Sequence, residues 1–235
     1  MAKTKKQSIY VIKLSGKLFF SSEFQKVATT FSSAVRKRST TLVLVAGGGP
    51  TARAYIEAGN KFETDQSSLD EIGIAVSRLN ATVLIQALGD CAFASVPRSL
   101  PEIADALKID RKKGKQRIVV CGGLHPGQST NAVAALVAEK IHATQFINAT
   151  DVDAVYDRDP RQFKTARKLS VVSVKRLGEI LGDESVQAGA YDLMDPVALK
   201  IIARSRIPTS IVKCDPKVLQ RILEGERYQG TRITF

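Results

Sequence analysis

The feature that most constrains the fold of this chain is an alternation of short apolar runs, rich in β-branched residues, with longer segments of helical period. The runs predicted to be strands are Ser8–Leu14, Thr40–Ala46, Thr82–Ala87, Arg117–Cys121, Gln145–Ala149 and Pro208–Val212. The segments predicted to be helices are Glu23–Lys37, Pro50–Lys61, Asp70–Leu79, Thr130–His142, Val174–Leu181 and Pro196–Ser205. Alternating strands and helices indicate an α/β fold, and strands that are apolar throughout indicate a mainly parallel sheet between two layers of helices.

The composition is that of an ordinary globular protein of one large domain. The chain has 235 residues, of which 44% are hydrophobic and 25% charged. No linker rich in Pro, Ser or Gly divides it, so we expect a single domain over residues 1–235, of which residues 1–7 are a basic tail. No apolar run approaches the roughly 20 residues that span a bilayer, and no cleavage site follows the basic start, so we expect a cytoplasmic protein with no membrane contact.

The chain is strongly basic and carries few cysteines and histidines. A net charge of +12 favours anionic partners in general. The basic clusters lack interleaved aromatic residues and the chain has no Trp, so we expect no nucleic-acid partner. Cys91, Cys121 and Cys214 are scattered without the CxxC spacing, and with His125 and His142 they do not make a zinc site. We therefore expect reduced, mostly buried thiols and no metal site made by the protein alone.

Glycine-rich or polar stretches follow four of the predicted strands. They are Lys13–Lys17 (KLSGK), Ala46–Tyr55 (AGGGPTARAY), Cys121–Ala132 (CGGLHPGQSTNA) and Asn148–Pro160 (NATDVDAVYDRDP). Glycine lets backbone N–H groups approach a ligand closely, and the N-terminus of the helix that follows carries partial positive charge. Because the carboxyl ends of parallel strands share one edge of a sheet, these stretches together predict a phosphate-binding site there. In the third stretch, Thr130 is expected to cap its helix.

Two common phosphate folds fit poorly. The pattern GxxxxGK[ST] does not occur, which excludes a P-loop protein. Gly47–Ala52 does match the dinucleotide pattern GxGxxA, but it follows the second predicted strand rather than opening the first unit. A dinucleotide oxidoreductase remains a minor alternative.

The order and spacing of the four stretches resemble the amino acid kinase superfamily and, within it, the UMP kinases of the archaeal type. Ser68–Ala81 and Tyr191–Ser205 are similar to that family as well, so the resemblance covers nearly the whole chain. It implies the amino acid kinase fold, with an N-terminal lobe over about residues 8–143 on the UMP side and a C-terminal lobe over about residues 144–235 on the ATP side. It also implies transfer of the ATP γ-phosphoryl group to UMP with Mg²⁺, a homohexamer built as a trimer of dimers, and inhibition by UTP.

The resemblance assigns roles to individual residues. Residues implied in catalysis are Lys13, Arg53 and Asn131. Residues implied in binding ATP are Lys13, Leu14, Ser15, Gly16, Lys17, Gly49, Arg53, Thr150, Asp151, Tyr156 and Asp159. Residues implied in binding UMP are Gly48, Asp70, Leu124, His125, Pro126, Gly127, Gln128, Ser129 and Thr130.

Elementary chemistry agrees with the main roles. Two polyanions must be brought together in line, so positioning and charge neutralisation dominate such a reaction. The Lys13 ammonium suits charge on the transferring phosphoryl group, and the Arg53 guanidinium fork suits phosphate oxygens. The Asp70 carboxylate can accept both hydroxyls of a ribose. One position departs from the superfamily pattern, because Asn131 stands where an aspartate commonly organises the lysine; asparagine accepts hydrogen bonds but cannot balance charge.

Other readings stay open at this stage. The phosphoryl acceptor could be acetylglutamate, aspartate, carbamate or isopentenyl phosphate, although Arg53 with Asp70 favours an acceptor that has both a phosphate and a sugar diol. The protein could also be a non-catalytic nucleotide sensor, against which intact Lys13, Arg53 and Asp70 argue. Turnover with UMP and ATP separates an enzyme from a sensor.

Overall fold

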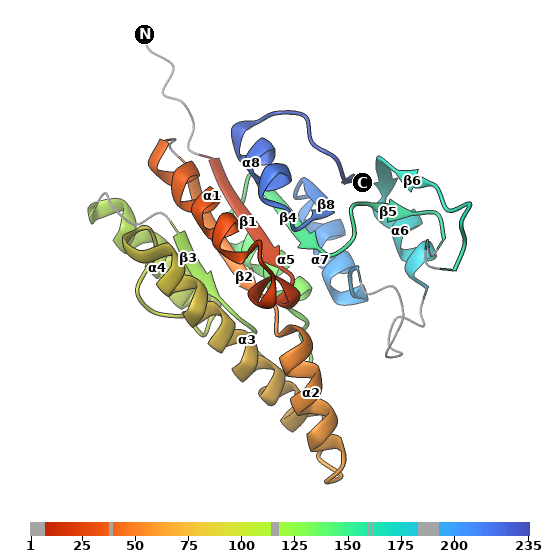
Figure 1. Cartoon of the computed structure of the whole chain (residues 1–235), viewed down its shortest axis with the longest axis horizontal. Helices are drawn as coiled ribbons and strands as arrows, with labels where there is room; N and C mark the ends of the chain where they lie inside the picture. Colours follow the sequence, from red (N-terminus) through yellow and green to blue (C-terminus); the bar gives the residue numbers. More distant parts are fainter. Residues whose placement is uncertain (1–7, 38–39, 114–117, 159, 161, 183–192) are drawn as a thin grey trace.

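A computed structural model describes residues 8–37, 40–113, 118–158, 160, 162–182 and 193–235, with the side chains of residues 109–113 excepted. Its centre is a seven-stranded sheet in the order β3-β2-β1-β4-β8-β9-β7 (Figure 1). The strands are β1 (Ser8–Leu14), β2 (Thr40–Ala46), β3 (Ile118–Cys121), β4 (Gln145–Thr150), β7 (Val171–Ser173), β8 (Thr209–Lys213) and β9 (Thr231–Thr234). A separate hairpin pairs β5 (Val155–Tyr156) with β6 (Lys168–Leu169).

The first five strands of the sheet order, β3 to β8, are parallel, and the strand order reverses between β1 and β4. From β1 it passes outward to β2 and β3, and it then returns to β4 on the other side of β1 and continues to β8. β9 is antiparallel to β8, so the sheet is mainly rather than wholly parallel. In such a sheet, ligands bind beyond the carboxyl ends of the strands at the point of reversal. That point lies between Lys13 of β1 and Asn148 of β4, which are direct neighbours in register.

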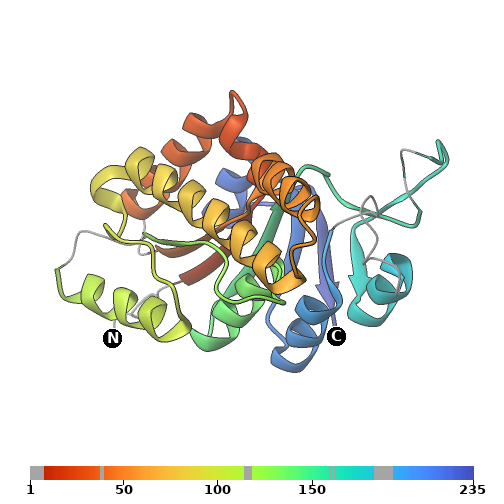
Figure 2. The same ribbon diagram turned by 90° about the horizontal axis from the view of Figure 1, so that it is seen from below.

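Helices cover both faces of the sheet. Figure 2 views it nearly edge-on, with α1 and α3 on one side and α4, α5 and α7 on the other. The helices are α1 (Phe24–Lys37), α2 (Gly49–Asn60), α3 (Gln66–Leu88), α4 (Leu100–Lys113), α5 (Thr130–Lys140), α6 (Val174–Leu181), α7 (Pro196–Ser205) and α8 (Pro216–Glu224), with short 3₁₀ turns η1 (Gly16–Phe20) and η2 (Gly89–Cys91). The predicted three-layer α/β fold is confirmed.

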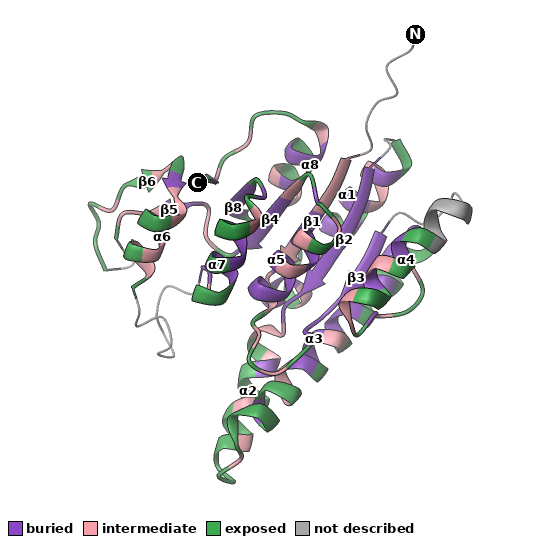
Figure 3. Cartoon of the chain, turned by 180° about the vertical axis from the view of Figure 1, so that it is seen from behind, coloured by how far each residue is buried: buried purple, intermediate pink, exposed green. Residues whose placement is uncertain are grey.

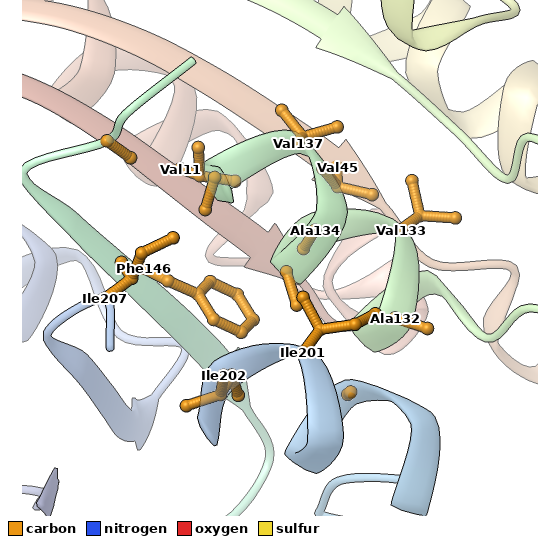
Figure 4. Close-up of a cluster of buried hydrophobic side chains, with 14 of the residues drawn as sticks. Val11, Val45, Ala132, Val133, Ala134, Val137, Phe146, Ile201, Ile202 and Ile207 are labelled. Atoms are coloured by element: carbon orange, nitrogen blue, oxygen red, sulfur yellow. The ribbon is translucent and has the colours of Figure 1, made fainter. Parts of the chain in front are cut away.

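Each face of the sheet has its own core. Val11 and Phe146 point to one face, where they pack with α5 and with Ile201 and Ile202 of α7 (Figure 4). Ile12 and Leu14 point to the other face, against α1, α3 and α8. Strand β2 is buried along its whole length, whereas α2 is mostly exposed (Figure 3). Period-two alternation thus sends successive β1 residues to opposite cores.

The structure corrects one predicted strand. Thr82–Ala87 is the last part of α3, a helix of 23 residues that begins after the cap Asp65, whose side chain accepts the N–H of Ser68. No Gly or Pro interrupts the chain from Ile74 to Leu88, so nothing ends the helix where the strand was expected. A short apolar run cannot by itself distinguish a buried strand from a buried helix.

The same helix, with the 3₁₀ turn that follows it, bears on the expectation that no segment spans a membrane. Among the described residues, Gln66–Cys91 is long and apolar enough, by length and composition, to cross a membrane. In the structure, however, it lies along the sheet, and Leu84, Ile85 and Leu88 are buried in the core. A helix that covers a sheet has the same composition, so length and apolarity alone do not place this one in a bilayer.

Candidate active site

The glycine-rich and polar stretches meet at one edge of the sheet, as predicted. They follow β1, β2, β3 and β4, which are neighbouring parallel strands and therefore end at the same edge. Gly47 N–H donates to the Leu14 carbonyl at 3.0 Å, and Ser15 N–H donates to the Ala149 carbonyl at 3.0 Å. The exits of β2, β1 and β4 are thus tied side by side in the order of the strands.

Gly16 and Gly49 bring two of these exits into backbone contact. A Cβ on Gly16 would lie 2.2 Å from the Gly49 nitrogen, and one on Gly49 would lie 2.5 Å from the Gly16 carbonyl carbon. Gly49 also has a φ of +65°, a conformation that favours glycine. The two glycines are therefore required by a close approach, and together they leave main-chain groups rather than side chains at the centre of the edge.

Lys13 lies beside Asn148, and the amide of Asn148 shares a backbone acceptor with that of Asn131. Asn148 of β4 is fully buried and Asn131 of α5 is 5% exposed, and both donate from Nδ2 to the Leu193 carbonyl, at 2.6 and 3.4 Å. Neither Oδ1 has a hydrogen-bond partner within the described part of the chain. Buried acceptors without partners concentrate at functional sites. Sequence reasoning missed Asn148, although an asparagine inside an apolar strand was the feature that could have found it.

A cavity of about 200 Å³ lies between the β2 exit, α3 and the β3 exit. The residues that line it are Gly48, Gly49, Ala52, Arg53, Asp70, Gly73, Ile74, Ser77, Gly123, Gln128 and Thr130. The structure thus brings together most of the predicted phosphate and ribose contacts. The Oε1 atom of Gln128 is buried without a partner in the described structure, so this cavity contains an acceptor that is ready for a ligand donor.

The loop after β3 is held by its neighbours. Gly127 N–H donates to Asp70 Oδ2 at 2.7 Å, which leaves the other carboxylate oxygen of this exposed residue for a ligand. Ser129, not Thr130 as expected, caps α5, because its Oγ accepts the N–H groups of Asn131 and Ala132, both at 3.1 Å. The Ser129 hydroxyl also donates to Asp195 Oδ2. Thr130 is therefore left facing the cavity.

The remaining loop residues are placed differently. Leu124 packs its side chain into the core, so it can meet a ligand through its backbone. His125, Pro126 and Gly127 do not belong to the cavity lining, and His125 and Gly127 are exposed.

A larger cavity of about 490 Å³ opens beyond the ends of β4 and β8. Its lining residues are Asp151, Val152, Asp153, Tyr156, Pro160, Lys213, Asp215, Lys217, Val218, Arg221 and Gln229. Asp151 and Tyr156 were predicted, whereas Thr150 lies buried at the end of β4 and donates to Asp151 Oδ1 at 3.1 Å. The predicted residue Asp159 lies outside the described residues. Sequence reasoning missed Lys217 and Arg221, because α8 was not predicted, and it missed Lys213, the last residue of β8, because the predicted strand ended at Val212.

Charged groups organise the mouth of this larger cavity. Tyr156 donates its hydroxyl to Asp153 Oδ1 at 2.9 Å, and Lys168 forms an ion pair with Asp153 and lies 5.9 Å from the centre of the Tyr156 ring. Partial burial raises the pKa of Asp153, but the hydrogen bonds from Lys168 and Tyr156 outweigh it, so the pKa lies below its usual value. Asp153 is therefore a carboxylate at neutral pH, and it fixes the Tyr156 ring at the cavity.

An ion pair joins the exits of β1 and β4. Lys17 Nζ lies 2.5 Å from Asp151 Oδ2. Burial raises the pKa of Asp151, but the hydrogen bond and the charge of Lys17 lower it more, so the pKa lies below its usual value. Because Asp151 lines the larger cavity, and Lys17 follows the Gly16 that touches Gly49 of the smaller one, this edge connects the two cavities.

The donor groups present suit a magnesium ion that arrives with a ligand. Within the described ranges, no group of three or more His, Cys, Asp or Glu residues could hold a metal ion. Mg²⁺ commonly keeps several waters and binds through one or two carboxylates together with substrate phosphates. Asp151 supplies a carboxylate at the connecting edge, which fits binding of that kind.

Comparison with known proteins agrees with this geometry. Residues 8–213 match the model of the amino acid kinase family. Uridylate kinase from Sulfurisphaera tokodaii is 42% identical over 219 residues, covering 91% of this chain and 92% of that protein. Uridylate kinase from Pyrobaculum calidifontis is 37% identical, covering 95% and 99%.

Solved structures give the same result. The crystal structure of uridylate kinase from Archaeoglobus fulgidus superposes with a TM-score of 0.82 at 37% identity, covering 96% of this chain and 99% of that one. The UMP kinase of Ureaplasma parvum, at 19% identity and a TM-score of 0.77, shares the fold over 98% of this chain. The chain therefore belongs to the amino acid kinase family and, within it, to the uridylate kinases.

Proposed function

We propose that this protein is a UMP kinase, which transfers the γ-phosphoryl group of ATP to the phosphate of UMP and releases UDP and ADP. A phosphate oxygen of UMP attacks the γ-phosphorus, and the bond from that phosphorus to the oxygen bridging it to the β-phosphate breaks. One observation carries the proposal: two cavities of different size are joined by an edge of glycine amides and lysines. Such an edge is what in-line transfer between two polyanions needs.

The smaller cavity is assigned to UMP. Arg53 and the amide of Gly48 would bind its phosphate, Asp70 would bind its ribose, and the loop from Leu124 to Thr130 would surround its base and phosphate. In that loop, the unpartnered Gln128 Oε1 can accept the N3–H of uracil. The volume of about 200 Å³ suits a nucleoside monophosphate that remains partly open to solvent.

The larger cavity is assigned to ATP. Asp151 and Tyr156 would contact the adenosine. The triphosphate would be lined by Leu14, Ser15, Gly16, Lys17 and Gly49. ATP would compete with Asp151 for Lys17, so the ion pair between them opens when the triphosphate binds. Mg²⁺ bound with ATP would neutralise part of the triphosphate charge.

Lys13 is the central catalytic group in this proposal. It lies at the point of reversal, next to the contact between Gly16 and Gly49, where its ammonium can stabilise the transferring phosphoryl group. Asn131, together with the Asn148 that the structure adds, offers neutral acceptors on the same side of the sheet. Amides can orient an ammonium group without cancelling its charge, which a carboxylate would do.

The acceptor is tested by measuring ADP release with UMP, CMP, dUMP, AMP and isopentenyl phosphate. We expect turnover on UMP well above that on the other acceptors. Higher turnover on isopentenyl phosphate than on UMP would assign the protein the activity of a different branch of the family. Binding of UMP and ATP without ADP release would make it a sensor.

We also propose a homohexamer built as a trimer of dimers, with UTP as an inhibitor. Support for a dimer contact comes from α3, where Leu79 is 61% exposed and Val83 is 44% exposed beside the exposed Ala75. These residues form one apolar stripe on a helix whose opposite side packs on the sheet, and such stripes mark interaction surfaces. Leu79→Asp should lower the mass measured by light scattering; an unchanged mass would exclude a contact through this stripe.

A further inference from the structure

One turn of α3 holds the loop that follows β3. Ser77 Oγ accepts the N–H of Gly123 and donates to the Ile74 carbonyl, both at 2.7 Å. The next residue, Arg78, donates from Nε to the Gly123 carbonyl at 3.0 Å and from Nη2 to the Leu124 carbonyl at 3.1 Å. Two N–H groups of one guanidinium thus donate to successive carbonyls of the loop assigned to UMP.

The same turn holds the loop that follows β2. Asn80 Nδ2 donates to the Gly47 carbonyl at 2.8 Å and approaches the Gly48 carbonyl at 3.4 Å. Asn80 and Ser77 are 7% and 1% exposed, on a helix whose other inward residues are apolar. Burying polar groups is unfavourable unless they are hydrogen-bonded, and here the bonds go to the two loops rather than to the core.

Close packing also holds the loop that follows β3 against the helix. A Cβ on Gly122 would lie 2.7 Å from both the Arg78 nitrogen and Ser77 Oγ. A Cβ on Gly123 would lie 2.8 Å from Ile74 Cγ1. The backbone of the loop that follows β3 therefore packs directly on α3, beside the carbonyls to which Arg78 donates.

We propose that this turn of α3 fixes the separation between the two glycine-rich loops, and that Arg78 and Asn80 are positioning residues for phosphoryl transfer. A helix is a rigid spacer, and Asn80 anchors one loop two residues along the chain from the point where Arg78 anchors the other. The inference rests on the proposed function, since it concerns the alignment of the two phosphates. A displacement of about 1 Å in such an alignment can lower the rate about 100-fold.

The test compares two ligands that each occupy one cavity with one ligand that occupies both cavities and therefore depends on the separation of the two loops. The variants are Asn80→Ala and Arg78→Lys, which retains the charge but lacks the fork. Thr29→Ala is the matched control, because Thr29 is exposed on α1 and donates only within its own helix among the described residues. The ligands are UMP, ATP, and adenosine and uridine joined through their 5′ oxygens by a polyphosphate chain.

For both variants we expect the dissociation constant of the joined ligand to rise about tenfold or more, and those of UMP and ATP to change by less than about threefold. Likewise kcat should fall more than either KM changes. Parallel weakening of all three ligands would reduce Arg78 and Asn80 to general structural residues and overturn the proposal, as would unchanged binding of the joined ligand.

A second measurement separates this inference from the proposed function. Failure of the wild-type protein to bind UMP would refute the function without touching the geometry. In that case, hydrogen exchange should still speed up at residues 47–49 in Asn80→Ala and at residues 122–124 in Arg78→Lys, each without change at the other loop. Exchange unchanged at both loops, or raised equally at both, would overturn the positioning role.

Discussion

Replacing Gly16 by alanine should push apart the loop that follows β1 and the loop that follows β2, whose contact joins the two cavities. The added Cβ would lie 2.2 Å from the nitrogen and 2.4 Å from the Cα of Gly49, and 2.7 Å from the carbonyl carbon of Gly48. All three atoms are backbone, so no flexible side chain can move aside. Gly16 has no positive φ, so the effect of the substitution is steric rather than conformational.

The size of the effect follows from these distances. Ordinary contact begins at 3.4 Å, so the loops would have to move apart by about 1.2 Å. A shift of about 1 Å at reacting groups can lower the rate about 100-fold, and overpacking of this kind costs about 1–3 kcal/mol of folding free energy. We therefore expect Gly16→Ala to lose about two orders of magnitude in kcat and several degrees in Tm.

Steady-state UDP formation and thermal unfolding measure the two effects. Gly178→Ala is the matched control: this glycine lies in α6, and an added Cβ would meet Leu199 Cδ1 at 4.0 Å, which is ordinary contact. Alanine there should leave kcat unchanged and stabilise the protein by up to about 1 kcal/mol. Wild-type kcat in Gly16→Ala would refute the reasoning, because the two loops could then separate without consequence.

Three further predictions concern other parts of the site and the core. Arg53→Ala should lower kcat/KM for UMP about 10- to 100-fold, since charge-assisted hydrogen bonds to phosphate are among the strongest, and Arg53→Lys should recover part of it in the same assay; a change below twofold would remove Arg53 from the phosphate site. Lys17 lowers the pKa of Asp151 in the folded state, so the ion pair stabilises the folded protein above pH 3.8, the usual pKa of an aspartate, and this stabilisation is lost as the pH falls below that value. Asp151→Asn should therefore flatten the acid side of a plot of Tm against pH, and an unchanged acid side would argue against the pair. Burial raises the pKa of Cys121 to about 12, so iodoacetamide at pH 8 should not label this thiol until the protein unfolds; rapid labelling of Cys121 in the native protein would contradict this.

Local patterns predicted the parts of the molecule whose physics is local. A glycine run after an apolar strand is required by the close approach of Gly16 to Gly49, and it is visible in the sequence. The parallel order of β3, β2, β1 and β4 follows from alternating strands and helices, and it accounts for the meeting of their exits. The division into two lobes near residue 143 stays a prediction.

Tertiary context decided the rest. Thr82–Ala87 has strand-forming residues, but it follows a helix without a breaker and packs on the sheet as helix. Asn80 looks like a polar residue on a helix surface until the fold places the β2 loop beneath it. Asn148 likewise can be recognised as a site residue only when Lys13 and Asn131 are known to be its neighbours. Such roles depend on contacts between residues far apart in the chain, which no single-sequence pattern contains.

The central claim, transfer of the γ-phosphoryl group of ATP to the phosphate of UMP across this edge, is tested most directly by following the phosphorus itself. The protein would be incubated with UMP, Mg²⁺ and ATP labelled in the γ-phosphate, and the products separated. The account predicts that the label appears in the β-phosphate of UDP in amounts equal to the ADP formed. Label released as inorganic phosphate, or retained in ATP, would contradict it.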